Sequence, residues 1–333
     1  MLRDAAAQTQ DMRVLEGAAL DGLDWESVGR YRARAEGCRP GHPWQGLEDT
    51  AFLEQLGAAG TGGDGAVHPT AAGLLLFGRE REIVRAFPAY SLEYRDRTGN
   101  GREILSASGD WSGNLFDFYF RVRAALARGI PGSGRPGEGE DREVSGALGE
   151  AVANSLINAD YWGSGGIRVV REAEQVTISN PGGFRIGVDA ARSGGVSDPR
   201  NGALSRMFNR ISIGASTGSG IPNIYSVWKR RGWTLPVIEE RFAPERTVLT
   251  LPLRGSGRRD APVPAGCGAE RNPVGKQMII EYLTEHPRAR AAEIGAYIEL
   301  EPSCVREDLE QLIRQEIVSV EEDGEGRMYR LKS

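Results

Sequence analysis

Apolar residues recur every three or four positions through the first part of the chain, which predicts helices with one buried side. Such helices are expected in LDWESVGRYRARAEG (23–37), LEDTAFLEQLGAAG (47–60) and GNLFDFYFRVRAALARG (113–129). TAAGLLLFG (70–78) is expected to be a buried segment, and AYSLEYRD (89–96) a strand. The last helix carries its core-facing apolar residues at Leu115, Phe118, Val122 and Leu126.

The pattern changes in the middle of the chain. GEAVANSLINADYWGSGG (149–166) begins with a proline-free, helix-like arrangement of small and apolar residues. GIRVVRE (166–172) and QVTISNPGGF (175–184) are rich in β-branched residues and predict the two strands of a hairpin. A long segment punctuated by glycine follows (193–232), and ERTVLTLPL (245–253) predicts a further strand.

The last part of the chain predicts three helices and a hairpin. The helices are expected in 273–287, 290–298 and 303–315, the third opened by a serine that suits an N-cap. Two short strands, IVSVEE and RMYRLK, are joined by the turn DGEG at 323–326. Three helices followed by a hairpin form a winged helix-turn-helix, whose third helix is typically placed in the major groove of DNA.

Two segments have the composition of linkers. Residues 129–143 are rich in glycine, proline and charge, and residues 254–273 have almost no large apolar residue. The first is a surface loop or a boundary, and the second is the stronger boundary signal. The chain is therefore expected to divide into a mixed α/β region, a middle domain, a linker and a winged helix-turn-helix, at 1–143, 144–254, 255–272 and 273–333.

The charge distribution bears on the winged helix. The formal net charge is −5, and residues 270–333 alone hold 14 acidic and 9 basic side chains, so the remainder of the chain is balanced. Phosphate contacts supply much of the affinity for DNA and require basic residues. The domain therefore fits a protein-interaction role as well as it fits DNA binding. Its candidate nucleic-acid contacts are Arg306, Arg314 and Arg327.

Composition excludes several classes of protein. The longest apolar run, AAGLLLF, is too short to cross a bilayer, and the N-terminus has no apolar core of a secretory signal. The three cysteines lie far apart in sequence, which argues against a disulfide framework or a structural zinc site. We therefore expect a cytoplasmic protein with no membrane partner.

Glu150, Asn154 and Asn158 form a polar stripe on the helix predicted at the start of the middle domain. The carboxylate can orient or deprotonate a water, and an amide oxygen can complete the oxygen shell of Mg²⁺. A solvent-facing side of a helix would give the same pattern. The residues alone leave both interpretations open.

Two glycine-rich turns follow the stripe in sequence. Ser179–Gly183 (SNPGG) ends a predicted strand and would let a flat ligand approach the backbone, although an ordinary turn has the same composition. Gly218–Gly220 (GSG) precedes Pro222, which suits the first turn of a helix. Backbone N–H groups at such a helix start can hold phosphate, but the pattern by itself is weak.

Taken together, EAVANSLINADY, ISNPGGF, SDPRN and GSGIPNI resemble, in this order, the divergent GHKL-type ATP-binding domain of RecG-related, Schlafen AlbA-type bacterial proteins. Upstream segments resemble the same family, so the likeness covers roughly residues 12–253. Members are often labelled transcriptional regulators. The resemblance implies an α+β fold: a GHKL (Bergerat) α/β sandwich with an N-terminal mixed extension and a C-terminal winged helix-turn-helix.

The resemblance also implies roles for individual residues. Glu150 would be the general base for ATP hydrolysis, and Asn154 would bind Mg²⁺. Asn180 stands where the superfamily has an adenine-recognising aspartate. Ser193–Thr217 would supply a mobile lid over the phosphates. The remaining nucleotide-binding positions would be Gly182, Gly183, Gly218, Ser219 and Gly220.

The sequence departs from the family at several places. Asn158 stands where relatives have histidine, and Ala215 and Ser216 replace a Glu-Arg pair. Loss of that pair makes ATP hydrolysis less certain than ATP binding. The AlbA-type domain that normally comes first is also missing from the sequence. No GxxxxGK[ST] phosphate loop occurs, so a helicase motor is not expected.

The expected function is an ATP-binding regulator that uses Mg²⁺ and has a possible ATPase activity. ATP would order the lid and so reposition the winged helix or a dimer interface. Expected partners are ATP, duplex DNA and a second copy of the chain. The alternatives are a non-enzymatic DNA-binding regulator with a vestigial nucleotide site, and an interaction subunit of an RNA-processing or defence system.

Overall fold

The computed structural model describes residues 9–98, 103–106, 111–128, 142–195, 197–214 and 218–254, and separate stretches between 279 and 332. The chain forms two compact units, Met1–Ser256 and Gly257–Ser333. Each unit is described by itself. The predicted linker at 255–272 lies outside the described residues.

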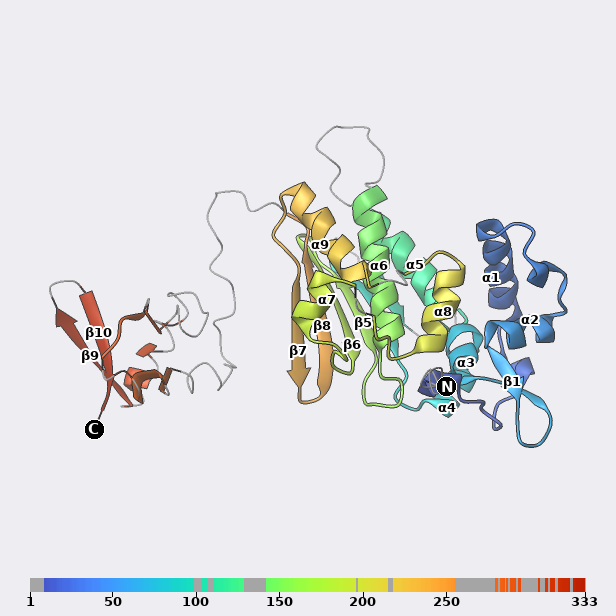
Figure 1. The fold of residues 1–333 in the computed structure, drawn as a ribbon, viewed down its shortest axis with the longest axis horizontal. Coiled ribbons are helices and arrows are strands. Elements are labelled where there is room, and N and C mark those ends of the chain that lie inside the picture. The colour runs from blue at the N-terminus through green and yellow to red at the C-terminus, as the bar shows by residue number, and fades with distance from the viewer. Residues whose placement is uncertain are drawn as a thin grey trace, which may run out of the picture. The chain divides into compact units, whose positions relative to one another are not determined.

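A six-stranded mixed sheet organises the first unit, in the order β4-β3-β5-β6-β8-β7 (Figure 1). The predicted hairpin is confirmed as the antiparallel pair β5–β6, while β3 and β5 run parallel. The sheet includes β3 and β4, which precede residue 143, so the first two predicted parts of the chain share it. Its strands are β3 (Leu92–Asp96), β4 (Glu103–Ser106), β5 (Ile167–Arg171), β6 (Gln175–Pro181), β7 (Val237–Phe242) and β8 (Glu245–Pro252).

Helices α6 (Arg142–Asn158) and α9 (Gly220–Arg231) pack against each other beside the sheet, with α7 (Val188–Ser193) against α9 and α5 (Leu115–Ala127) against α6. The apolar side of α5 is buried as its sequence predicts, and Trp228 of α9 is completely buried. Because α6 contacts β5, β6, α5, α8 and α9, the helix that carries the polar stripe is held from several directions. The α+β fold class is confirmed.

The N-terminal region is mostly helical. The segment expected to be merely buried, 70–78, forms a short helix in which every residue is buried, with Thr70 as its N-cap. Its elements are α1 (Trp25–Cys38), α2 (Asp49–Leu56), β1 (Ala59–Thr61), β2 (Val67–Pro69), α3 (Ala71–Phe77), α4 (Glu80–Ala86) and the 3-10 turns Gln10–Met12, Leu20–Gly22 and Pro43–Gly46.

Helix α8 (Gly202–Arg210) lies inside the segment that was expected to form a mobile lid. Leu204, Met207 and Phe208 are completely buried in the core. The buried Asp11 carboxylate accepts a hydrogen bond from the Leu204 N–H at 2.9 Å, which caps the helix start. The prediction that all of 193–217 is a lid is therefore wrong for its central part, because α8 is a packed element of the core.

The second unit contains an antiparallel hairpin, β9 (Val318–Asp323) and β10 (Gly326–Leu331), as predicted. Ahead of it, helical residues such as Ile279, Leu283 and Leu309 share a small core with Val318. Arg306 lies outside the described residues, whereas Arg314 and Arg327 are exposed. Among the described residues of the whole chain, no helix is both long and apolar enough to cross a membrane.

Candidate functional site

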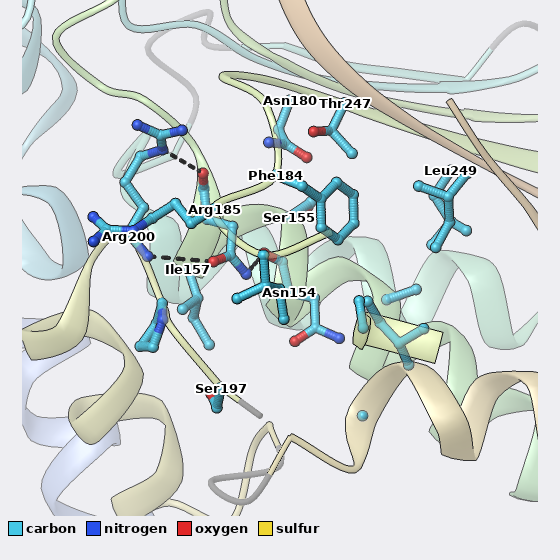
Figure 2. A pocket seen from close by; sticks show the side chains of 18 of the residues that line it. Asn154, Ser155, Ile157, Asn180, Phe184, Arg185, Ser197, Arg200, Thr247 and Leu249 are labelled. Carbon is cyan, nitrogen blue, oxygen red and sulfur yellow. Dashed lines mark hydrogen bonds between the residues drawn. The ribbon is translucent and has the colours of Figure 1, made fainter. Parts of the chain in front are cut away.

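A cavity of about 130 Å³ opens beside α6, the ends of β6 and β8, and the start of α9 (Figure 2). Its walls combine apolar side chains with asparagine, serine, threonine, tyrosine, arginine and aspartate side chains. Such a combination is typical of a small-molecule site, in which apolar walls give affinity and polar groups fix orientation. The apolar walls include Ile178, Phe184, Ile224, Ile238 and Leu249.

Two residues of the α6 stripe meet the glycine turn at the start of α9. A Cβ atom added at Gly220 would lie 2.3 Å from Glu150 Oε1 and 3.0 Å from Asn154 Nδ2, so a larger residue there would displace the ends of these two side chains. Asn154 lines the cavity, and its carboxamide makes no hydrogen bond with the described residues. Glu150 is half-buried beside the cavity without lining it. The structure thus brings Glu150, Asn154 and Gly220 together.

Helix α5 packs beside the part of α6 that carries Gly149 and Glu150. A Cβ atom at Gly149 would approach the Tyr119 hydroxyl to 3.2 Å and Arg123 Nε to 3.5 Å, so the glycine in mid-helix leaves room for these side chains. Burial raises the pKa of Tyr119, Arg123 lowers it by a smaller amount, and the nearby Glu150 carboxylate raises it again. Tyr119 therefore stays a protonated hydroxyl next to Glu150.

Asn180 lies at the end of β6 on the opposite side of the cavity and is buried. Its Nδ2 donates to the Pro181 carbonyl at 3.1 Å, which leaves the side-chain oxygen as the group directed to the cavity. This amide orientation is assigned from the hydrogen bond. Thr247 on β8 pairs with Asn180 across the strands, and its hydroxyl donates to the Gly182 carbonyl at 2.9 Å.

Glycine is favoured at positions 182 and 183 for different physical reasons. Gly182 has φ +89°, and a Cβ atom there would lie 3.0 Å from Nη2 of Arg200. Gly183 lines the cavity, and a Cβ atom there would lie 2.8 Å from Glu245 Oε1. The turn after β6 is therefore shaped by close neighbours, in addition to its backbone conformation.

The second glycine turn forms the start of α9. Gly218 has φ +70°, Ser219 is exposed and its side chain does not cap the helix, and Pro222 lies in the first turn as predicted. Gly218 and Gly220 line the cavity. The first N–H groups of a helix have no partner within it, so this end presents hydrogen-bond donors where Asn154 also lies.

Asn158 has a supporting role in the pocket wall. Its Oδ1 accepts a hydrogen bond from the Arg200 backbone N–H at 3.3 Å, and its Nδ2 donates to the Asn154 carbonyl at 3.0 Å. Arg200 Nε donates to the Asn158 carbonyl at 3.2 Å, and Nη2 donates to the Gly183 carbonyl at 3.0 Å. These bonds join the end of α6, the turn after β6 and the 197–201 loop.

Sequence reasoning missed Arg200, Thr247 and Phe184 as cavity residues. Thr247 could have been found by pairing the last predicted strand with the SNPGG strand. Arg200 lies in the SDPRN segment that resembles the family, but its place beside the cavity depends on contacts with residues 17 and 42 positions away in the chain. No group of three or more metal-ligating side chains of the His, Cys, Asp or Glu type occurs in the described part of the chain.

Comparisons with known proteins agree with the fold. Residues 1–93 match a domain of unknown function, DUF8451. A solved structure, the DIP2311 protein from Corynebacterium diphtheriae, is similar with a TM-score of 0.55 and 16% identity, over 99% of this chain and 71% of that chain. This likeness shows the fold alone. No curated protein matches.

Residues 165–250 match the family model HATPase_c_4, described as "Putative ATP-dependent DNA helicase recG C-terminal". The matched segment includes Asn180, Arg200, Gly218 and Gly220, whereas Glu150 and Asn154 precede it. Each family model covers less than a third of the chain. Residues 165–250 are therefore similar to this family, which is described by the C-terminal segment of RecG.

Proposed function

We propose that the cavity binds ATP together with Mg²⁺. The observation that carries this proposal is the convergence of Asn154, Glu150 and Gly220 at one end of an apolar cavity that has Asn180 at the other. These residues come from three separate elements and are far apart in sequence. The family match over 165–250 supports the same ligand.

The apolar end of the cavity suits a purine base. Phe184, Ile238 and Leu249 provide apolar surface there, and the Asn180 oxygen provides a hydrogen-bond acceptor. An acceptor at this place would pair with the 6-amino group of adenine and would repel the 6-oxo group of guanine. We therefore propose that ATP binds more tightly than GTP, although asparagine lacks the charge of an aspartate.

The other end suits phosphate and magnesium. The first N–H groups of α9 can donate to phosphate oxygens, and the unengaged Asn154 amide can supply an oxygen ligand. Mg²⁺ usually keeps several waters and takes few protein ligands besides substrate phosphates, so one amide fits its requirements. When bound, Mg²⁺ would neutralise phosphate charge.

Hydrolysis is the finer part of the proposal. Glu150 would accept a proton from the water that attacks the terminal phosphorus, while the bond from that phosphorus to the departing ADP oxygen breaks. We further propose that ATP binding regulates the second unit, whose hairpin and helical core residues suit a winged helix, or a dimer contact. Because α8 is fixed in the core, any lid movement would be confined to the segments on either side of it.

The test is titration calorimetry with a non-hydrolysable ATP analogue and Mg²⁺ on the wild type and on Asn154→Ala. We expect binding heat from the wild type and an affinity at least tenfold lower in the variant. Absence of binding heat from the wild type would end the proposal. If the analogue binds, phosphate release by the wild type compared with Glu150→Ala tests whether the site hydrolyses ATP.

A second candidate function, DNA binding, is favoured by the second unit, in which helical core residues are followed in sequence by the β9–β10 hairpin. A gel shift of the full chain with duplex DNA at low and high salt tests it. A shift that salt removes would favour a DNA-binding regulator. No shift at low salt would favour an interaction unit, which co-purification with a separate AlbA-type protein would support.

A further inference from the structure

Arg200 differs from the other charged side chains of the cavity. The described residues that line the cavity include three charged side chains, Arg185, Asp198 and Arg200. Arg185 and Asp198 form an ion pair at 2.9 Å, so their charges offset each other. Arg200 forms no ion pair with the described residues, and its side-chain bonds go to two carbonyl oxygens. The lining therefore keeps one uncompensated positive charge.

The two carbonyl bonds fix the guanidinium without neutralising it. One acceptor belongs to Asn158, the last residue of α6, whose carbonyl is one of the groups that a helix end leaves without a partner. The other acceptor is the carbonyl of Gly183, in the turn after β6. Nη1 makes no hydrogen bond with the described residues. An oriented cation with a free N–H edge is the arrangement that charge-assisted binding of an oxyanion requires.

The neighbouring turn is shaped around this guanidinium. A Cβ atom at Gly182 would lie 3.0–3.2 Å from three guanidinium atoms of Arg200, so a larger residue would require this group to shift by a few tenths of an ångström. The Asn158 amide also holds the Arg200 backbone N–H. The side chain is therefore preorganised, and a ligand would not have to order it on binding.

We propose that Arg200 is an anion-binding residue of this pocket and that it selects phosphate-bearing nucleotides over nucleosides. The inference rests on the proposed nucleotide-binding function and assigns the ligand's negative charge to a residue outside the α6 stripe and the glycine turns. It also explains how a pocket with no lysine in its lining would attract a polyanion.

Matched variants separate the charge from the shape of this side chain. Arg200→Gln removes the charge and keeps amide donors, whereas Arg200→Lys keeps the charge and loses the planar fork. Arg85→Ala is the control, because Arg85 is a largely exposed cation on α4 that does not line the cavity. Thermal melting followed by circular dichroism checks that each variant is folded.

Calorimetry with the non-hydrolysable ATP analogue and Mg²⁺, and with adenosine, is the measurement. We expect Arg200→Gln to weaken the analogue about tenfold and adenosine less than twofold, with Arg200→Lys nearer to the wild type for the analogue. Arg85→Ala should stay within about twofold of the wild type. The dependence of analogue affinity on salt should also become weaker in Arg200→Gln and stay unchanged in Arg85→Ala.

Two results would overturn the inference. One is an unchanged analogue affinity in Arg200→Gln, and the other is an unchanged salt dependence in that variant, which would mean that Arg200 serves only as a wall. The second readout decides the matter even where adenosine binds too weakly to measure. Failure of the proposed function is distinct from both, because the wild type would then show no analogue binding at all.

Discussion

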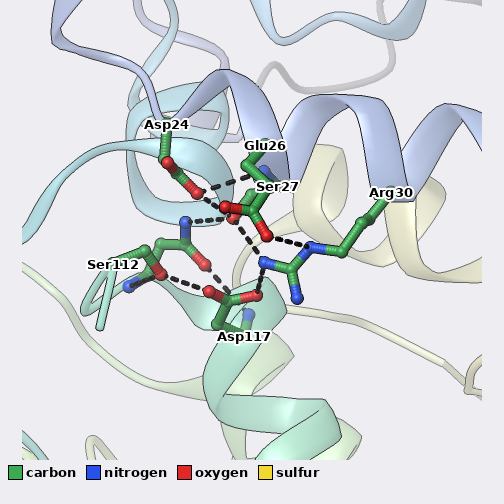
Figure 3. A network of polar contacts seen from close by, with 7 residues as sticks. Asp24, Glu26, Ser27, Arg30, Ser112 and Asp117 are labelled. Carbon is green, nitrogen blue, oxygen red and sulfur yellow. Dashed lines mark hydrogen bonds and ion pairs between the residues drawn. The ribbon is translucent and has the colours of Figure 1, made fainter. Parts of the chain in front are cut away.

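Two polar clusters in the first unit differ in how completely their groups are paired. One joins the start of α1 to the start of α5 (Figure 3). Asp24 accepts from Ser27, and the Asn114 amide donates to the Ser27 hydroxyl at 3.0 Å. Asp117 accepts from Arg30 on one oxygen and from Ser112 on the other. Every carboxylate of this α1–α5 cluster therefore has a partner within it.

The cavity cluster has the opposite character. The Asn154 amide makes no hydrogen bond with the described residues, the Asn180 oxygen faces the cavity, and Arg200 keeps its charge. Leaving such groups unpaired costs free energy that a purely structural cluster would avoid. The difference teaches that a cluster of polar side chains is a better candidate site when some of its hydrogen-bonding groups lack partners than when all of them are paired.

The strongest test of this contrast is Gly220→Ala. The added methyl group would collide with the Glu150 carboxylate and displace the Asn154 amide. We expect a loss of nucleotide affinity of about 100-fold, measured by calorimetry with the ATP analogue. Gly146→Ala is the control, since it lies on the exposed side of α6 with nothing within 4 Å of the new atom. Equal affinities of the two variants would contradict the account.

Substitutions in the α1–α5 cluster should change the stability of the fold and leave nucleotide affinity unchanged. Asp117→Ala removes a buried carboxylate that pairs with Arg30 and Ser112, and it leaves both donors without their acceptor. We expect a loss of about 2 kcal/mol in the free energy of unfolding, measured with urea, and unchanged nucleotide affinity. Glu26→Ala is the control: its carboxylate is 81% exposed and contacts Arg30 only at 3.8 Å. A similar loss in both variants would contradict this assignment.

Selection between adenine and guanine tests the incompletely paired cavity cluster. Asn180→Ala removes the acceptor that faces the cavity. We expect the preference for the ATP analogue over the GTP analogue to fall by about tenfold, because one hydrogen bond then no longer discriminates the bases. Paired calorimetric titrations with the two analogues measure this ratio. A variant that keeps the wild-type preference would show that base recognition lies elsewhere.

The smallest expected effect concerns a hydrogen-bonded histidine of the N-terminal region. His68 contacts the Ala18 carbonyl and Asp64, and these contacts raise its pKa above the ordinary 6.5. Because the folded pKa is the higher one, this stabilisation is complete below about pH 6.5 and is lost as the pH rises through the folded pKa. The stability difference between wild type and His68→Gln should therefore be larger at pH 5.5 than at pH 8.5. A difference that grows with pH would contradict the pairing.

Periodicity predicted most of the elements correctly because their burial is one-sided. The α5 pattern and the β5–β6 hairpin follow directly from where their apolar residues lie. The family resemblance assigned the buried helix α8 to a lid, and the local sequence could not correct this, because the capping Asp11 lies 193 residues away from Leu204. No local pattern reports such a distant cap.

The candidate site was predictable only in part for a similar reason. Helical spacing identifies Glu150 and Asn154 as candidates, and composition identifies the glycine turns. Arg200 stands in the SDPRN segment of the resemblance, but only the folded chain shows that Asn158 and Gly183 hold its guanidinium beside the cavity. The sequence assigns Gly220 to a phosphate-binding glycine turn, and the structure adds that a Cβ atom there would meet Glu150 and Asn154.

The central claim is tested most directly by one thermal-shift series on the wild type, Asn154→Ala and Asp117→Ala, each with and without the ATP analogue and Mg²⁺. We expect Asp117→Ala to melt at a lower temperature and still gain stability from the ligand. Asn154→Ala should melt like the wild type and gain little. A wild type that the ligand leaves unchanged, or an Asp117→Ala variant that alone loses the ligand effect, would contradict the account.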